Sequence, residues 1–105
     1  MSSNDAVRTL QLRRYELVPG SIDDFIAWFT STVVPAREAL GFRIEFALAD
    51  REANEFVWAV STPGNEEAFR ARETRYLDSG ERAAAFAGEP QRVAVYHVRF
   101  AEVIL

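Results

Sequence analysis

The sequence of 105 residues has no cysteine and no lysine, and its only histidine is His97. Without cysteine, disulfides and thiol chemistry are excluded. Zinc sites draw several ligands from His and Cys, so we expect no metal site. Haem needs only one axial ligand, so His97 leaves haem binding open. Apart from that alternative, we expect no cofactor.

Long apolar runs and a basic surplus are also absent. No apolar stretch approaches the ~20 residues of a membrane span, and the N-terminus lacks the basic and apolar regions of a signal peptide. The formal net charge is −4 and the arginines are scattered along the chain, unlike the basic patch of a nucleic-acid binder. No glycine-rich phosphate loop or nucleophile elbow is present. We therefore expect a soluble cytoplasmic protein with neither a membrane nor a nucleic-acid partner.

Hydrophobic periodicity predicts two β-α-β units. After a frayed or disordered segment at 1–7, residues 8–105 are expected to form a single domain. Ser21 and Asn65 are the predicted N-caps of the two main helices, and Pro35 is expected to interrupt or kink the first. The predicted strands cover 8–18, 42–49, 55–61 and 92–104, and the predicted helices run from 22 to about 40, from 66 to about 77, and within 79–88. This order indicates an α+β, ferredoxin-like sandwich with a four-stranded antiparallel sheet.

The last strand is apolar on both of its faces, since Val95 alternates with Tyr96 and Val98. The predicted second strand likewise carries one strongly apolar face, made of Phe42, Ile44, Phe46 and Leu48. A sheet with helices on one side only normally has a polar second face, and a large exposed apolar face indicates a partner. We therefore predict a homodimer in which two sheets pack face to face.

The stretch QLRRYELVPG (residues 11–20) resembles the first strand of NIPSNAP proteins, which commonly reads Glu-Leu-Arg-x-Tyr-x-Leu-x-Pro-Gly. Gln11 stands in place of the glutamate, and the matching residues are Leu12, Arg13, Tyr15, Leu17, Pro19 and Gly20. VVPAREALGF (residues 33–42) is similar to the proline-interrupted end of the family's first helix, and Trp58 lies where its third strand carries a tryptophan. The resemblance covers roughly residues 8–88. It implies a dimeric α/β barrel built from two ferredoxin-like subunits.

Two adjacent arginines lie within the first strand. Alternation places Gln11, Arg13, Tyr15 and Leu17 on one face and Leu10, Leu12, Arg14 and Glu16 on the other. An unpaired buried charge is costly, so we expect at least one of these arginines to be paired, with Glu16 and Glu45 as candidate partners. The alternative is an arginine that faces a ligand carboxylate or enolate. The polar residues of the second main helix, Arg70, Arg72, Glu73 and Arg75, are interpreted as a solvated face.

The wider superfamily implied by the resemblance includes cofactor-independent monooxygenases, isomerases and polyketide cyclases, which hold flat hydrophobic substrates between sheet and helices. The candidate catalytic residues are His97 and Arg13. If they share a sheet face, a neutral imidazole can remove a proton while the cation stabilises the resulting anion. The candidate ligand-binding residues are Tyr15, Trp28 and Trp58. The alternative role of all five is structural, and Trp58 in particular is expected to be buried.

Two functions follow from these residues. The first is a small NIPSNAP-like dimer that binds a small hydrophobic or aromatic molecule. The second is a cofactor-independent enzyme (a monooxygenase, isomerase or cyclase) acting on an aromatic or polyketide-like substrate. A pocket that holds His97 within hydrogen-bond reach of an arginine would favour the enzyme.

Overall fold

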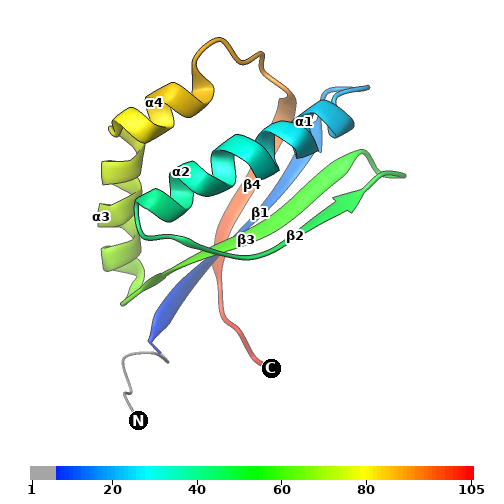
Figure 1. Cartoon of the computed structure of the whole chain (residues 1–105). Coiled ribbons are helices and arrows are strands. Elements are labelled where there is room, and N and C mark those ends of the chain that lie inside the picture. Colours follow the sequence, from blue (N-terminus) through cyan, green and yellow to red (C-terminus); the bar gives the residue numbers. More distant parts are fainter. Residues whose placement is uncertain (1–6) are drawn as a thin grey trace.

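The computed structural model describes residues 7–105 and consists of a four-stranded antiparallel sheet with all the helices on one side (Figure 1). The strand order is β2-β3-β1-β4, which confirms the predicted ferredoxin-like α+β fold. In chain order the elements are β1 (Arg8–Leu17), α1 (Ile22–Trp28), the π-helical turn η2 (Phe29–Val33), α2 (Val34–Ala39), β2 (Arg43–Asp50), β3 (Glu55–Pro63), α3 (Glu66–Leu77), α4 (Gly80–Phe86) and β4 (Val93–Ala101). Of the segment predicted to be frayed, residues 1–6 lie outside the described residues. None of the helices in residues 7–105 combines the length and apolarity needed to cross a bilayer.

The first helical segment continues through Pro35 as α1, η2 and α2. A proline inside an α-helix has no N–H to donate and its ring clashes with the carbonyl four residues earlier. Here the wider π-helical turn directly precedes α2, in whose first turn Pro35 lies. The irregularity predicted at Pro35 is therefore a change of helix type.

The two predicted N-caps have different outcomes. The Asn65 side chain accepts a hydrogen bond from the Ala68 N–H at 2.9 Å, as predicted. Ser21 occupies the predicted N-cap position of α1, but its backbone is already helical (φ −96°, ψ −7°) and its side chain makes no capping hydrogen bond. Its hydroxyl instead donates to the carbonyl of Val18 at 2.7 Å and closes the turn before α1.

The hydrophobic core lies between the helices and the sheet face that carries Tyr15 and Leu17 of β1. In the register of β1 and β3, Arg13 lies opposite Trp58 and Tyr15 opposite Phe56. Trp58 is 2% exposed, which confirms its predicted burial. The other large buried side chains of this layer are Phe25, Phe29, Phe42, Val60, Phe69 and Tyr76.

The second strand departs from the predicted alternation. Ile44 pairs with Val60, but Phe46 pairs with Ala59, so the register of β2 against β3 shifts by one residue between them. A bulge of this kind moves all later side chains to the opposite face. Phe46 and Leu48 therefore do not continue the face of Ile44, and they lie 41% and 58% exposed on the side of the sheet away from the helices.

Candidate ligand-binding site

A cavity of about 190 Å³ lies between the helix-facing side of the sheet and the helices. It brings together Arg13, Tyr15, Trp28 and Trp58 from the sequence-based prediction, and it excludes His97. Its walls are mainly aromatic. The remaining lining residues are Phe25, Phe29, Val33, Arg37, Glu73, Tyr76, Leu77, Arg82, Phe86, Val93 and Tyr96.

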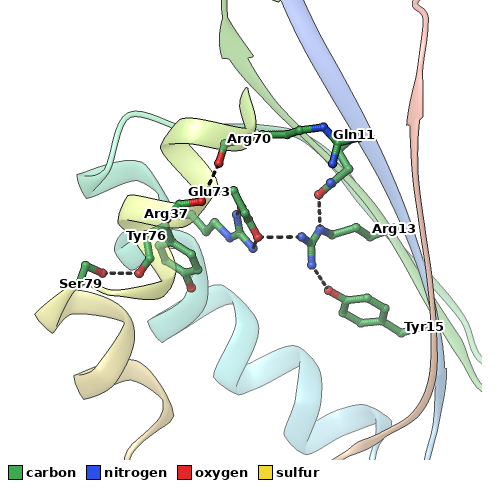
Figure 2. A network of polar contacts seen from close by, with 9 residues as sticks. Gln11, Arg13, Tyr15, Arg37, Arg70, Glu73, Tyr76 and Ser79 are labelled. Atoms are coloured by element: carbon green, nitrogen blue, oxygen red, sulfur yellow. Dashed lines mark hydrogen bonds and ion pairs between the residues drawn. The ribbon is translucent and has the colours of Figure 1, made fainter. Parts of the chain in front are cut away.

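Arg13 projects from the middle of β1 into this cavity (Figure 2). Its Nε donates to the side-chain oxygen of Gln11 at 2.7 Å, and one terminal nitrogen donates to the hydroxyl of Tyr15 at 2.9 Å. The other terminal nitrogen donates to Glu73 of α3 at 3.1 Å. The strand therefore holds the guanidinium on two sides, because Gln11 and Tyr15 flank it at alternate positions of the same face, and α3 holds it on a third.

Arg37 reaches the same carboxylate from α2. Both of its terminal nitrogens donate to Glu73, one oxygen each, with the Nη2–Oε2 pair at 3.2 Å. Its guanidinium carbon lies 4.1 Å from the ring centroid of Tyr76 and 4.7 Å from that of Phe42. Arg37 is only 4% exposed, so its charge is held by one shared carboxylate and by aromatic faces.

The prediction that at least one of the two arginines of β1 is paired is confirmed, and Glu16, one of the two candidate partners, lies 3.9 Å from the guanidinium of Arg14. Glu16 shares the outer sheet face with Arg14, and Glu45 bonds Arg43 and Ser61, so neither acid reaches Arg13. The partner of Arg13 is Glu73, although the sequence pattern suggests a solvated face for this residue. Its position signals otherwise, since it follows Phe69 by four residues and precedes Tyr76 by three, and both of these are buried.

Arg37 was not among the predicted site residues. It follows Phe29 and Val33 at intervals of four residues, and both of these are buried. A charged residue on the apolar stripe of a helix is a signal for a buried ion pair or a site. That signal was available in the sequence and went unused.

The predicted pairing of His97 with Arg13 is wrong. In the register of β1 and β4, His97 lies opposite Arg14, and Arg13 lies opposite Val98. Neighbouring residues of a strand point to opposite faces, so His97 lies outside the cavity, where its Nε2 is 2.6 Å from Glu16 Oε2. Among residues 7–105, no three His, Asp or Glu side chains converge to hold a metal ion.

Several residues that line the cavity carry a buried donor with no hydrogen-bond partner within the described residues. These donors are Trp58 Nε1, the Tyr76 hydroxyl, Arg37 Nε and Arg82 Nε. The Trp28 indole, in contrast, donates to the carbonyl of Ala85 at 2.9 Å. Burial raises the pKa of Tyr76, an effect that the neighbouring Arg37 opposes, so Tyr76 keeps its proton at neutral pH. The cavity therefore combines aromatic walls with one polar end that is rich in donors.

Comparison with known proteins supports the fold. No family model matches the sequence, and no curated protein matches it. The structure resembles a NIPSNAP family protein of unknown function from Agrobacterium tumefaciens, with a TM-score of 0.79, 11% identity, and coverage of 90% of this chain and 86% of the other. It also resembles a NIPSNAP-like domain protein from Burkholderia xenovorans, with a TM-score of 0.77, 17% identity, and coverage of 92% and 85%.

A third similar structure comes from Bacteroides thetaiotaomicron and belongs to a protein proposed to be an antibiotic biosynthesis monooxygenase. Its TM-score is 0.70 at 14% identity, with coverage of 95% of this chain and 92% of the other. At such identities the likeness establishes the fold. The resemblance first read from residues 11–20 is thereby supported, and the chain has a NIPSNAP-like fold.

Proposed function

We propose that this protein binds a small aromatic molecule in the cavity between the sheet and the helices. The observation that carries the proposal is a largely aromatic cavity of about 190 Å³ whose lining residues carry buried N–H and O–H groups without a hydrogen-bond partner among residues 7–105. Ligand sites are typically concave and apolar with a few placed polar groups. An apolar cavity of about 150 Å³ is already large enough for benzene, so a molecule with one aromatic ring fits this space.

Binding of one-ring aromatic compounds is the first testable prediction. Both tryptophans of the chain, Trp28 and Trp58, line the cavity, so intrinsic fluorescence excited at 295 nm reports its occupation. We expect saturable fluorescence changes and a raised midpoint of thermal unfolding, because a ligand that binds only the folded state stabilises it.

A cavity-filling variant gives the matched control for this binding. Val33→Phe places a ring inside the cavity and should abolish the response. Ala27→Phe makes a comparable addition at an exposed position of α1 and should leave it intact. If no neutral or charged one-ring compound binds the unmodified protein, the proposed function is wrong.

We further propose that a second copy of the chain covers the outer sheet face. This face exposes Phe46, Leu48 and Val95, which a helix would normally shield. It also interleaves both signs of charge, with Arg43 beside Glu45 and Arg14 beside Glu55. A two-fold interface places one patch against itself and must be self-complementary, and a patch of mixed charge around apolar side chains meets that condition. The NIPSNAP resemblance supports the same arrangement.

Light scattering coupled to gel filtration tests the dimer. We expect the unmodified protein at micromolar concentration to have twice the mass of the chain. In a dimer, the double variant Phe46→Glu/Leu48→Glu would bury like charges against each other. We therefore expect this variant to be monomeric. Leu77→Glu alters an equally exposed apolar residue on the helical side and should remain dimeric. A monomeric unmodified protein would refute the proposal.

A cofactor-independent enzyme is the second candidate function, and the fold likeness to the Bacteroides protein favours it. The histidine that we had assigned to proton transfer lies on the other face of the sheet. The groups available for such chemistry in the cavity are therefore Arg13, Glu73 and Tyr76. Mass spectrometry of each bound aromatic compound after incubation in air separates the two functions, because an enzyme changes the compound and a binding protein returns it unchanged.

A further inference from the structure

The charge of the cavity has the opposite sign to that of the chain. The chain as a whole has a net charge of −4. The cavity is lined by three cationic side chains, Arg13, Arg37 and Arg82, and by a single acidic one, Glu73. Three positive charges less one negative charge leave an excess of two positive charges around a largely apolar space.

The carboxylate of Glu73 is already shared by two arginines. Each oxygen of Glu73 accepts from Arg37, and Oε2 also accepts from Arg13. Two guanidinium groups therefore share one negative charge. A buried cation without a full counter-charge is unfavourable, so this end of the cavity attracts a second anion.

The unsatisfied hydrogen-bonding capacity of the walls lies with donors. Guanidinium has five N–H groups, and Arg13 uses three of them on Gln11, Tyr15 and Glu73, which leaves two. Arg37 keeps its Nε–H, and the indole of Trp58 has no partner within the described residues. Guanidinium and indole groups can only donate. The ligand must therefore supply acceptor oxygens.

We infer that the ligand of this cavity is an aromatic carboxylate, with its ring among the aromatic walls and its carboxylate beside the Arg13–Arg37 pair. Arginine binds carboxylates through paired, charge-assisted hydrogen bonds. The two planar guanidinium groups that meet at Glu73 can thus bind a second carboxylate by donating their remaining N–H groups to it. This inference rests on the proposed function and adds the charge and the chemical class of the ligand.

The test compares benzoate with benzamide, which have nearly the same shape and differ in charge. Titrations followed by tryptophan fluorescence at neutral pH should show benzoate binding at least tenfold more tightly. Equal or tighter binding of benzamide would overturn the inference and leave the proposed function standing. If neither of them nor any other one-ring compound binds, the proposed function fails as well.

The two indole N–H groups supply an internal control in the ¹H–¹⁵N NMR spectrum. Trp58 Nε1–H has no acceptor among residues 7–105, whereas Trp28 Nε1–H is bonded to the carbonyl of Ala85. Benzoate at the polar end should therefore move the Trp58 indole signal more than the Trp28 signal. If only the Trp28 signal moves, the carboxylate does not reach the arginine pair and the assigned position is wrong.

A variant that removes the negative charge of the cavity should change benzoate affinity in a defined direction. Glu73→Gln removes the competing carboxylate, so benzoate affinity should rise at least threefold while benzamide affinity changes less than twofold. Glu66→Gln removes an exposed carboxylate from the same helix and should change neither. An unchanged or lowered benzoate affinity in folded Glu73→Gln would contradict the inference. If Glu73→Gln does not fold, the comparison of benzoate with benzamide and the two indole signals still test the inference.

Discussion

Glu73→Gln is expected to lower the free energy of unfolding by about 3 kcal/mol, although the substitution changes little in size. The carboxylate is the counter-charge of both Arg13 and Arg37, and all three side chains are largely buried. Removing one member of a buried ionic group leaves the remaining charges uncompensated, which costs more than the intact group contributes. Urea denaturation measures the difference, and both variants are compared at one fixed protein concentration because the stability of the proposed dimer would depend on concentration.

Glu66→Gln is the matched control for Glu73→Gln. Its carboxylate lies on the same helix and pairs with Arg70 four residues later, with both side chains exposed. Such pairs contribute about 0.3–0.5 kcal/mol. If the two variants were equally stable, Glu73 would not be the shared counter-charge of the cavity. Benzoate added to Glu73→Gln should recover part of the lost stability, since its carboxylate can take the vacated role.

Trp58→Ala is the second substitution with a large expected effect, a loss of about 3–5 kcal/mol in the free energy of unfolding. The ring is buried and packs against Phe29, with ring centroids 4.9 Å apart, and beneath the guanidinium of Arg13 at 5.3 Å. Its removal would enlarge an existing cavity, which the surrounding rings cannot collapse to fill. The loss is a large part of the 5–15 kcal/mol typical of small domains, so thermal unfolding should shift strongly.

Two further variants calibrate the Trp58 result. Trp58→Phe keeps an aromatic ring and should cost clearly less than the alanine variant. Leu77→Ala removes a side chain that is 52% exposed and should cost at most about 1 kcal/mol. An unfolding curve of Trp58→Ala that coincides with that of the unmodified protein would refute the role of Trp58 as the central packing residue of β3.

The architecture was predictable because local periodicity specifies it. Alternation in β1 and β4 and the apolar stripes of the helices each have a period that the sequence displays over many residues. The bulge in β2 was not predictable in this way, because it depends on how Phe46 meets Ala59 of the neighbouring strand. One shifted residue reverses the face of every later side chain, and the apparently continuous stripe from Phe42 to Leu48 is divided between two faces.

Part of the site was predictable because it also depends on the local alternation of a strand. Arg13 and Tyr15 were assigned to one face of β1 because they lie in a single strand. Whether His97 joined them depended on the pairing of β4 with β1, whose residues lie about eighty positions apart in the sequence. No local pattern specifies that register. Arg37 and Glu73, in contrast, stand at helical spacing from buried aromatic residues, and a search for charges on apolar stripes would have found them.

The π-helical turn η2 determines the angular phase of α2. Residues four apart in a regular α-helix advance by about 40° beyond a full turn, so Phe25, Phe29, Val33 and Arg37 would spiral away from a common direction. A wider turn at Phe29–Val33 reduces that drift and keeps Arg37 above the sheet. If Phe29–Val33 were a regular α-helix, the step from Phe29 to Val33 alone would add about 40° to the angle at which α2 presents Arg37. The wider turn thus sets the angle at which α2 presents Arg37 to the cavity that Phe29 and Val33 also line.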